Sequence, residues 1–308
     1  MKNISYNRQV ELLLKVLPLL NEYEDFALKG GTAINYFIRD LPRLSVDIDL
    51  CYLPIQERDE SLNKITSNIK DLSKQVSHYF PSARFNFKTI GKSSFLKGLI
   101  LNLDNILIKL EVNLIIRGSA NKPFLLKTKK NVEDEFKMSC KMKVLSFEDI
   151  YAGKICAALD RQHPRDLFDI KLLLENEGIS DLLRKTFLLY LIQSNRPIIE
   201  LLNPNILDIS NVYEREFRGM TRAQVSLKDL EDIQINLPCL IRKTLTNEEK
   251  KFLLDFKKQE EIDWNLLGLG NFSKLPGVKW KIHNIEKMDK TKHQEQLQNL
   301  SNYLNQLN

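Results

Sequence analysis

The first half of the chain alternates between segments whose apolar residues recur at helical spacing and short apolar runs typical of strands. The helical spacing predicts helices over residues 7–24, 32–39 and 56–79. The short runs predict strands at residues 26–28, 46–52, 84–90, 95–102 and 106–116. Strands with helices between them indicate an α+β fold with a mixed α/β sheet.

The second half of the chain is mainly helical in its pattern. A strand around Lys143–Leu145 leads into a helix over residues 147–159, and a second helix runs from about residue 165 to 174 or 175. From about residue 178 onward the chain is leucine-rich and amphipathic, without an internal repeat. We therefore expect two domains, residues 1–177 and a mainly helical part at residues 178–308, with the boundary at Gly178.

The composition is that of an ordinary globular protein. Of its 308 residues, 43% are hydrophobic and 28% are charged, and the net charge is +6, which permits a nucleic-acid partner without requiring one. The four cysteines are far apart and match no zinc spacing, so we expect a reducing compartment. The polar N-terminus does not resemble a signal peptide, and no apolar run has the length of a membrane span. We expect a cytoplasmic protein without a membrane partner.

Residues 28–52 combine three features that can carry chemistry. Gly30 and Gly31 form a tight turn that opens onto a helical run and offers bare backbone N–H groups to a phosphate. Asp47 and Asp49 alternate with apolar residues on a strand, so their side chains share one face. Two such carboxylates repel each other unless a cation lies between them, and Mg²⁺ prefers their hard oxygens. Each feature alone also fits a plain turn or a solvated strand edge, but together they favour metal-dependent chemistry on a nucleotide.

A third carboxylate, Glu111, lies inside the strand predicted at residues 106–116, among branched apolar residues. A carboxylate in such surroundings is costly unless it is paired or bound to a metal. Asp47, Asp49 and Glu111 on neighbouring strands would form a two-metal site, in which one metal activates the attacking hydroxyl and the other binds the triphosphate. This arrangement is typical of phosphoryl or nucleotidyl transfer.

A second cluster of charged residues spans Lys154 to Asp169. Lys154 and Arg161 are seven residues apart and share a helix face, so both could reach a triphosphate. Asp166 and Asp169 also share a face on the next helix. The alternative is a pair of charged, solvated helices. The small apolar residues after Lys154 indicate close packing and favour a functional role. The sequence contains no Gly-x-Gly-x-x-Gly, Walker A or His-Glu-x-x-His motif, so cofactor redox chemistry has no support.

In order and type these motifs resemble the AbiEii-type abortive-infection nucleotidyltransferase toxins, a branch of the DNA polymerase β-like nucleotidyltransferase superfamily. The resemblance is strongest over about residues 26–175, and the stretch from Leu245 to Lys281 resembles the C-terminal part of one subgroup. It rests on four motifs: Gly30-Gly31-Thr32, Arg43-x-Ser45-x-Asp47-Ile48-Asp49, Lys109-Leu110-Glu111-x-Asn113, and Lys154 with Arg161 and Arg165-Asp166-Leu167-Phe168-Asp169.

The resemblance implies a polymerase β-like sheet with flanking helices, and a role for each candidate site residue. The metal ligands, for Mg²⁺ or Mn²⁺, would be Asp47, Asp49 and Glu111. Asp166 would be a catalytic or base-positioning residue. The NTP would be bound by Gly30, Gly31, Thr32, Lys154 and Arg161. Two departures from the superfamily pattern are Thr32 in place of the usual serine and a longer gap before Asp47.

The function that the resemblance implies is transfer of a nucleoside monophosphate from an NTP to an acceptor, with the tRNA 3′ end as the expected one. The protein would be the toxin of a toxin–antitoxin or phage abortive-infection system, with a cognate antitoxin protein as its partner. One alternative is a non-catalytic RNA- or protein-binding module on a nucleotidyltransferase fold. The other is a transferase that acts on a small molecule or a protein hydroxyl.

Overall fold

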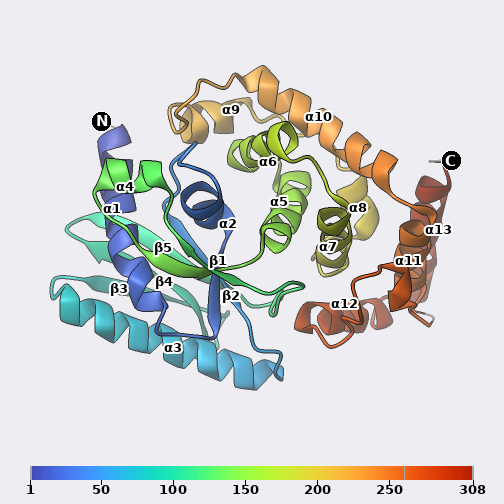
Figure 1. Cartoon of the computed structure of the whole chain (residues 1–308). Coiled ribbons are helices and arrows are strands. Elements are labelled where there is room, and N and C mark those ends of the chain that lie inside the picture. Colours follow the sequence, from blue (N-terminus) through green and yellow to red (C-terminus); the bar gives the residue numbers. More distant parts are fainter. Residues whose placement is uncertain (1, 260, 307–308) are drawn as a thin grey trace. The chain divides into compact units, whose positions relative to one another are not determined.

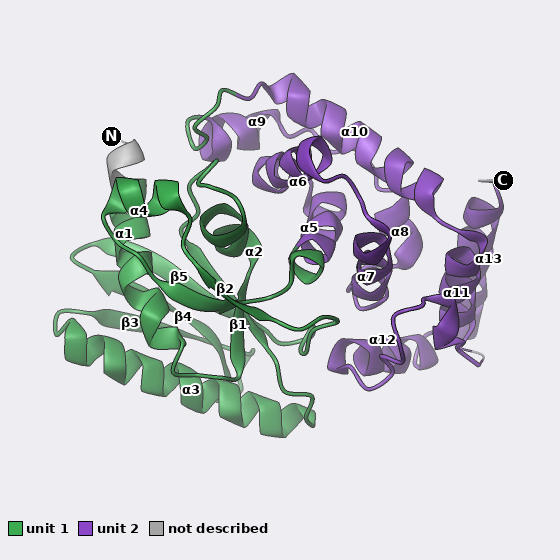
Figure 2. Cartoon of the chain, viewed as in Figure 1, with its two compact units in different colours: residues 1–150, 219–224 green, residues 151–218, 225–308 purple. Residues whose placement is uncertain are grey.

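The computed structural model describes residues 2–259 and 261–306 (Figure 1). The chain forms two compact units, one of residues 1–150 and 219–224 and the other of residues 151–218 and 225–308 (Figure 2). The domain division expected from the sequence, residues 1–177 and 178–308, stays a prediction. No helix in the described ranges is long and apolar enough to cross a membrane.

The first unit is built on a seven-stranded mixed sheet with the strand order β3-β4-β5-β2-β1-β7-β6. The pairs β2–β5 and β1–β7 are parallel, and the other neighbours are antiparallel. The strands are β1 (Phe26–Lys29), β2 (Asp47–Tyr52), β3 (Arg84–Thr89), β4 (Leu96–Leu103), β5 (Ile106–Asn113), β6 (Phe124–Lys127) and β7 (Lys141–Val144). The short strand β6 lies in a segment for which the sequence pattern predicts no strand.

Two long helices, α1 (Lys2–Leu20) and α3 (Arg58–Tyr79), cover one face of this sheet (Figure 1). Val16 of α1 and Leu72 of α3 line a small apolar cavity with Ile48 and Leu110 from the sheet. Burying this apolar surface drives the packing, because each buried methylene contributes about 0.8 kcal/mol. The residues that alternate with Ile48 and Leu110 therefore project from the opposite face of the sheet.

The opposite face carries the segment that follows β1. Here α2 (Gly30–Ala33) continues directly into a π-helix, η1 (Ile34–Ile38), and α4 (Lys130–Phe136) hydrogen-bonds through Asn131 to Asp40, just beyond η1. The sequence pattern predicts one short helix over residues 32–39, and the structure divides that segment into two helical types. The helix α5 (Phe147–Arg161) begins in the first unit and ends in the second.

The second unit is helical, as its leucine-rich pattern predicts. Its last helix buries Leu300 and Leu304, and the Tyr303 hydroxyl in this helix donates a hydrogen bond to the Leu202 carbonyl. The elements after α5 are α6 (Pro164–Asn176), α7 (Asp181–Ile192), α8 (Ile198–Leu202), α9 (Ser210–Val212), η2 (Tyr213–Phe217), α10 (Leu227–Thr244), α11 (Asn247–Lys258), η3 (Trp264–Leu266), α12 (Pro276–Glu286) and α13 (Lys290–Asn305).

Candidate functional site

The strand register places the three candidate carboxylates on one face of the sheet. In the parallel pair β2–β5, Asp49 lies opposite Glu111, and Asp47 lies opposite Lys109. Along β2, the partly exposed Asp47 and Asp49 alternate with the buried Ile48 and Leu50. The prediction that Asp47 and Asp49 project from the same side of a strand is therefore confirmed. Glu111 joins them through cross-strand pairing.

Within this cluster, Glu111 forms an ion pair with a lysine. Lys109 Nζ lies 2.8 Å from Glu111 Oε2, and the two side chains are 45% and 37% exposed. Glu111 is therefore less buried than its apolar neighbours in sequence suggested. Asp47, Asp49 and Glu111 have the oxygen donors and the backbone register that suit a divalent cation. Yet among the described residues no three His, Cys, Asp or Glu side chains converge closely enough to hold a metal ion.

The glycine turn directly adjoins these carboxylates. Gly30 has a positive φ of 72°, and a Cβ atom added there would lie 2.4 Å from Asp49 Oδ2. A Cβ at Gly31 would lie 2.7 Å from an Arg43 Nη and 2.9 Å from Ser45 Oγ. Gly30 is favoured by its positive φ and by the approach of Asp49, whereas a side chain at Gly31 would displace the Arg43 guanidinium and the Ser45 hydroxyl. The structure thus brings together the turn and the strand that the sequence places in one motif.

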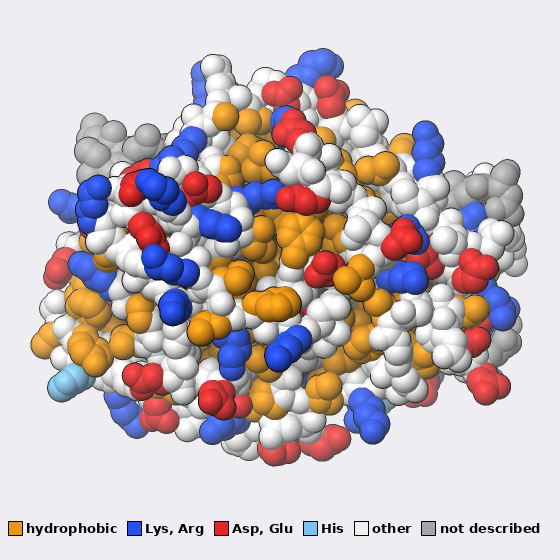
Figure 3. Space-filling view, in the orientation of Figure 1, with side chains coloured by type: hydrophobic (Ala, Val, Ile, Leu, Met, Phe, Trp, Pro, Cys, Tyr) orange, Lys and Arg blue, Asp and Glu red, His pale blue; other side chains and the backbone are white. Residues whose placement is uncertain are grey.

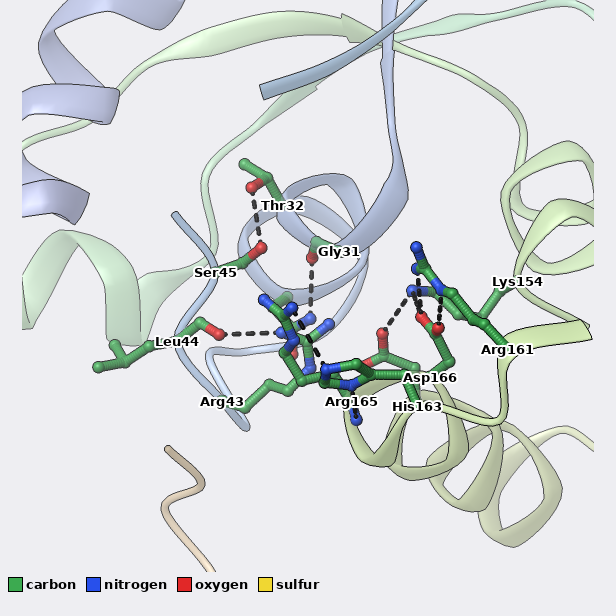
Figure 4. Close-up of polar contacts among 12 residues, drawn as sticks. Gly31, Thr32, Arg43, Leu44, Ser45, Lys154, Arg161, His163, Arg165 and Asp166 are labelled. Carbon is green, nitrogen blue, oxygen red and sulfur yellow. Dashed lines mark hydrogen bonds and ion pairs between the residues drawn. The ribbon is translucent and has the colours of Figure 1, made fainter. Parts of the chain in front are cut away.

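Thr32 fastens the start of β2 to the helix α2. Its side chain is 1% exposed, and its hydroxyl donates a hydrogen bond to the Asp47 carbonyl at 2.6 Å and lies 3.1 Å from Ser45 Oγ (Figure 4). Ser45 N donates in turn to the buried Tyr36 hydroxyl at 2.8 Å. Burial raises the pKa of Tyr36 well above its ordinary value, so this hydroxyl stays protonated. These contacts fix the backbone from which Asp47 and Asp49 project.

The second unit contains a buried ion-pair cluster between α5 and α6. Lys154 Nζ lies 2.7 Å from Asp166 Oδ1 and 3.1 Å from Asp169 Oδ2, and the three side chains are 6%, 2% and 0% exposed. Arg161 Nε lies 2.5 Å from Asp166 Oδ2, while the Arg161 side chain remains 63% exposed (Figure 4). Burial raises the pKa of Asp166, but attraction to Lys154 and bonding to Arg161 outweigh it, and the net pKa is well below the ordinary value.

His163 begins the helix that carries Asp166. Its Nδ1 accepts a hydrogen bond from Arg165 N at 3.1 Å, which caps α6, and Pro164 occupies the first helical position. Its Nε2 lies 3.2 Å from Glu216. Burial lowers the pKa of His163 and so favours the neutral ring, whose Nδ1 can accept the hydrogen bond from Arg165 N. The structure therefore gives His163 the role of N-cap of α6.

Three neighbours of the carboxylates had no role in the predictions from sequence. Lys109 pairs with Glu111, Lys29 lies opposite Asp49 in the β1–β2 pair, and Arg43 packs against Gly31. Lys109 and Glu111 are two residues apart on a strand, so their spacing alone could have indicated the pair. Finding Lys29 and Arg43 needs the strand register and the loop path, which are non-local.

Comparisons with known proteins agree with this geometry. The family model described as "Nucleotidyl transferase AbiEii toxin, Type IV TA system" matches residues 11–263. A search of curated protein sequences finds no match. Among solved structures, the chain is similar to MenT4, a nucleotidyltransferase toxin from Mycobacterium tuberculosis H37Rv. The TM-score is 0.59 at 12% sequence identity, over 91% of this chain and 93% of that chain.

The structural likeness confirms the mixed α/β fold class predicted from the sequence. The family match spans most of the chain, including both charged clusters and most of the helical second unit. It also confirms the resemblance drawn from the four motifs. The chain belongs to the AbiEii family of nucleotidyltransferase toxins of type IV toxin–antitoxin systems.

Proposed function

We propose that this nucleotidyltransferase moves a nucleoside monophosphate from an NTP to the 3′ end of a tRNA or another RNA, in a Mg²⁺-dependent reaction that releases pyrophosphate. The observation that carries the proposal is the β2–β5 register, which pairs Asp49 with Glu111 and places Asp47 on the same face. Family membership implies an NTP substrate and an antitoxin partner.

The metal ligands in this proposal are Asp47, Asp49 and Glu111. When bound, Mg²⁺ would supply charge stabilisation for the transferring phosphoryl group and would activate the attacking hydroxyl. Three carboxylates on one small area of sheet provide the negative charge for that binding, and Lys109 supplies the opposing charge in its absence. Mn²⁺ offers the same preference for oxygen ligands and is an expected substitute.

In the first unit, the NTP phosphates are proposed to bind at Gly30, Gly31 and Thr32. For Lys154 and Arg161 of the second unit, contact with the triphosphate stays a prediction from the sequence. Arg161 suits a phosphate because its side chain is 63% exposed and its planar fork has donors beyond the Nε that holds Asp166. Lys154 is buried against two carboxylates, so we propose that it acts by holding Asp166 ionised and in place. Thr32 acts mainly by fixing the backbone at Asp47.

The RNA acceptor is the finer part of the proposal. On the face in Figure 3, Lys and Arg side chains are interspersed with Asp and Glu rather than gathered in one basic patch. The net charge of +6 therefore favours a polyanionic partner only weakly. The cytoplasm, where tRNA and NTPs are found, is proposed as the compartment; all four cysteines are free thiols, consistent with a reducing environment.

The experiment is a transfer assay with each labelled NTP, Mg²⁺ and total RNA, resolved on a gel. We expect label on a tRNA-sized band with the wild type, and at least a hundredfold loss with Asp49→Asn or Asp47→Asn. Both variants should unfold at the wild-type temperature, since the two carboxylates lie on a partly exposed face. A chelator should abolish transfer, and added Mg²⁺ should restore it.

The outcomes separate the alternatives. Full activity in either Asp variant would overturn the metal assignment. Binding of NTP and RNA without any transfer would support the non-catalytic module instead. Label on protein or on a small molecule, with none on RNA, would overturn the RNA acceptor while leaving the nucleotidyltransferase assignment in place.

A further inference from the structure

The row of residues that contains the candidate carboxylates continues across five strands of the first unit. The strand registers align Lys88 of β3, Gly98 of β4, Glu111 of β5, Asp49 of β2 and Lys29 of β1. Directly paired residues share a face, so this row lies on the face opposite α1 and α3. The carboxylates are in the middle of the row, and a lysine lies toward each end.

Burial shows that this face is accessible beside the carboxylates. Along β4 and β5, Leu99, Leu101, Ile108 and Leu110 are buried under α1 and α3. Apart from the buried Gly98, the residues that alternate with them are partly or fully exposed, namely Ile100, Asn102, Leu107, Lys109 and Glu111. Arg84 and Asn86 of the edge strand β3 are exposed on the same face, because the alternating Phe85 lines the cavity beneath the other face.

The charge on the β3 side of the row is positive and uncompensated. Within the part of the chain that the structure describes, Arg84 and Lys88 form no ion pair. Gly98, which is buried, stands between Lys88 and Glu111 in the row and has no side chain to pair with either of them. A chain passing over β4 toward Glu111 would therefore meet two cations first and then the carboxylates.

The two sides of the carboxylates differ in a way that suits two substrates. On the β1 side, the backbone of Gly30 lies against Asp49 in the turn proposed to hold the NTP phosphates. The β3–β4 side lies across the carboxylates from that turn, since the strand order is β3-β4-β5-β2-β1. Phosphoryl transfer places the attacking and leaving oxygens roughly in line on opposite sides of the phosphorus atom. The acceptor should therefore approach from the side away from the NTP turn.

We propose that the open face of β3 and β4, with Arg84, Asn86, Lys88 and Asn102, binds the sugar-phosphate backbone of the RNA acceptor and directs its 3′ end toward Asp49 and Glu111. The inference rests on the function proposed above and adds where the acceptor binds. Arg84 and Lys88 contribute charge attraction to phosphates, and the two asparagines contribute hydrogen bonds without sequence readout.

The test compares binding of total tRNA to the wild type, Lys88→Glu, Arg84→Glu/Lys88→Glu and a matched control, Lys70→Glu. Lys70 is an exposed lysine on α3, which covers the other face of the sheet. Fluorescence anisotropy at several salt concentrations gives the affinity and its salt slope. We expect the double variant to bind about tenfold more weakly, with a salt slope reduced by about 0.9 for each lost phosphate contact. Lys70→Glu should bind as the wild type does.

NTP affinity and the unfolding temperature are measured for the same four proteins. Both should stay at wild-type values, because the substituted side chains are exposed or half-buried and lie on strands or helices away from the glycine turn. Equal tRNA binding by the wild type and the double variant would contradict the proposal that this surface binds RNA, and the proposed transfer to RNA would still stand. An equal loss of NTP binding would assign the surface to the nucleotide instead. If the wild type labels no RNA in the transfer assay, the proposed RNA acceptor is wrong, and so is the assignment of this surface to it.

Discussion

Lys109 is the residue whose contact most directly concerns the proposed metal site. Its ammonium group lies 2.8 Å from Glu111 Oε2. In the β2–β5 pair, Lys109 also lies opposite Asp47. A cation at this point offsets the repulsion among three carboxylates. The same charge must compete with a divalent ion that approaches Glu111. Lys109 is therefore expected to weaken metal binding at the proposed site.

We expect Lys109→Met to tighten Mn²⁺ binding by up to about tenfold, or roughly 1.4 kcal/mol. Methionine keeps a similar length and removes the charge that competes for Glu111. Titration of Mn²⁺ followed by electron paramagnetic resonance measures free ion directly, without relying on activity. Lys70→Met serves as the control for loss of one positive charge. Unchanged or weaker binding in Lys109→Met would contradict this role for the lysine.

Lys154 shows the opposite situation, a buried cation between two buried carboxylates. Without it, Asp166 and Asp169 would remain ionised in a site that water does not reach. Breaking a buried pair by removing one partner typically costs about 3–5 kcal/mol. We expect Lys154→Met to lose about that much stability in urea denaturation at pH 7. A double variant, Lys154→Met/Asp166→Asn, should recover part of it.

The stability that Lys154→Met loses relative to the wild type should become smaller as the pH falls. In the wild type the pKa of Asp166 is lowered on folding, so its contribution is complete above the unfolded pKa of about 3.9 and declines as the pH falls below that. In Lys154→Met only Arg161 remains to lower that pKa, so the pKa is lowered less and the variant loses less stability as the pH falls. The stability gap between the two proteins should thus shrink as the pH falls below about 5. A constant gap would indicate that packing, not charge, dominates.

At the scale of elements, the sequence predicts what local pattern determines. The strands β3, β4 and β5 and the helix α3 lie close to their expected positions, because apolar periodicity alone defines them. β5 ends at Asn113, earlier than expected, because the Asn113 side chain accepts hydrogen bonds from Ile115 N and Ile116 N and turns the chain. The strand β6 escaped prediction because its four residues depend on pairing with β7.

In the candidate site, too, local sequence pattern predicts some features, and long-range packing determines the others. Strand alternation predicts that Asp47 and Asp49 project from one side of β2, and this is confirmed. The pairing of Asp49 with Glu111 depends instead on the order of the strands in the sheet. Strand order is set by long-range packing and not by either strand's own residues. The engagement of Lys154 with Asp166 and Asp169 likewise needs the angle between two helices. The roles of these residues in catalysis stay predictions.

Gly98 gives an element-scale prediction about how closely β4 and β5 approach. A Cβ atom at this position would lie 2.1 Å from the Leu110 carbonyl oxygen, and neither backbone can yield cheaply within the sheet. We expect Gly98→Ala to cost about 1–3 kcal/mol or more in urea denaturation. Gly153→Ala is the matched control, because its Cβ would only touch Tyr190 at 3.4 Å inside the helix α5. There alanine should be neutral or stabilising by up to about 1 kcal/mol.

At the scale of the whole molecule, the chain passes between its two compact units more than once. It leaves the first unit at residue 150, returns to it for residues 219–224 and then completes the second unit. In the first unit, Thr221 forms a β-bridge with Arg43. Leu44 N donates to Met220 O at 3.0 Å, and Arg222 N donates to Pro42 O at 2.9 Å. A segment remote in sequence thus fixes the loop that precedes β2.

This connection leads from the returning segment to the glycine turn. The bridged residue Arg43 is 3% exposed, and its guanidinium lies where a side chain at Gly31 would be. Loosening the bridge should therefore loosen Arg43 and, through it, the backbone proposed to hold the NTP phosphates. Local composition could not reveal this, because residues 219–224 show no pattern that ties them to a loop about 180 residues earlier.

We expect Arg222→Pro to raise hydrogen–deuterium exchange at residues 40–46 and to weaken NTP binding several-fold, because proline lacks the N–H that bonds to Pro42 O. Arg222→Ala keeps that N–H and loses only the exposed ion pair with Glu135, which contributes at most about 1 kcal/mol. It should therefore exchange as the wild type does. If both variants exchange as the wild type does at residues 40–46, the backbone hydrogen bond from Arg222 does not hold this loop in place. If neither changes NTP affinity, the loop is not coupled to the nucleotide turn.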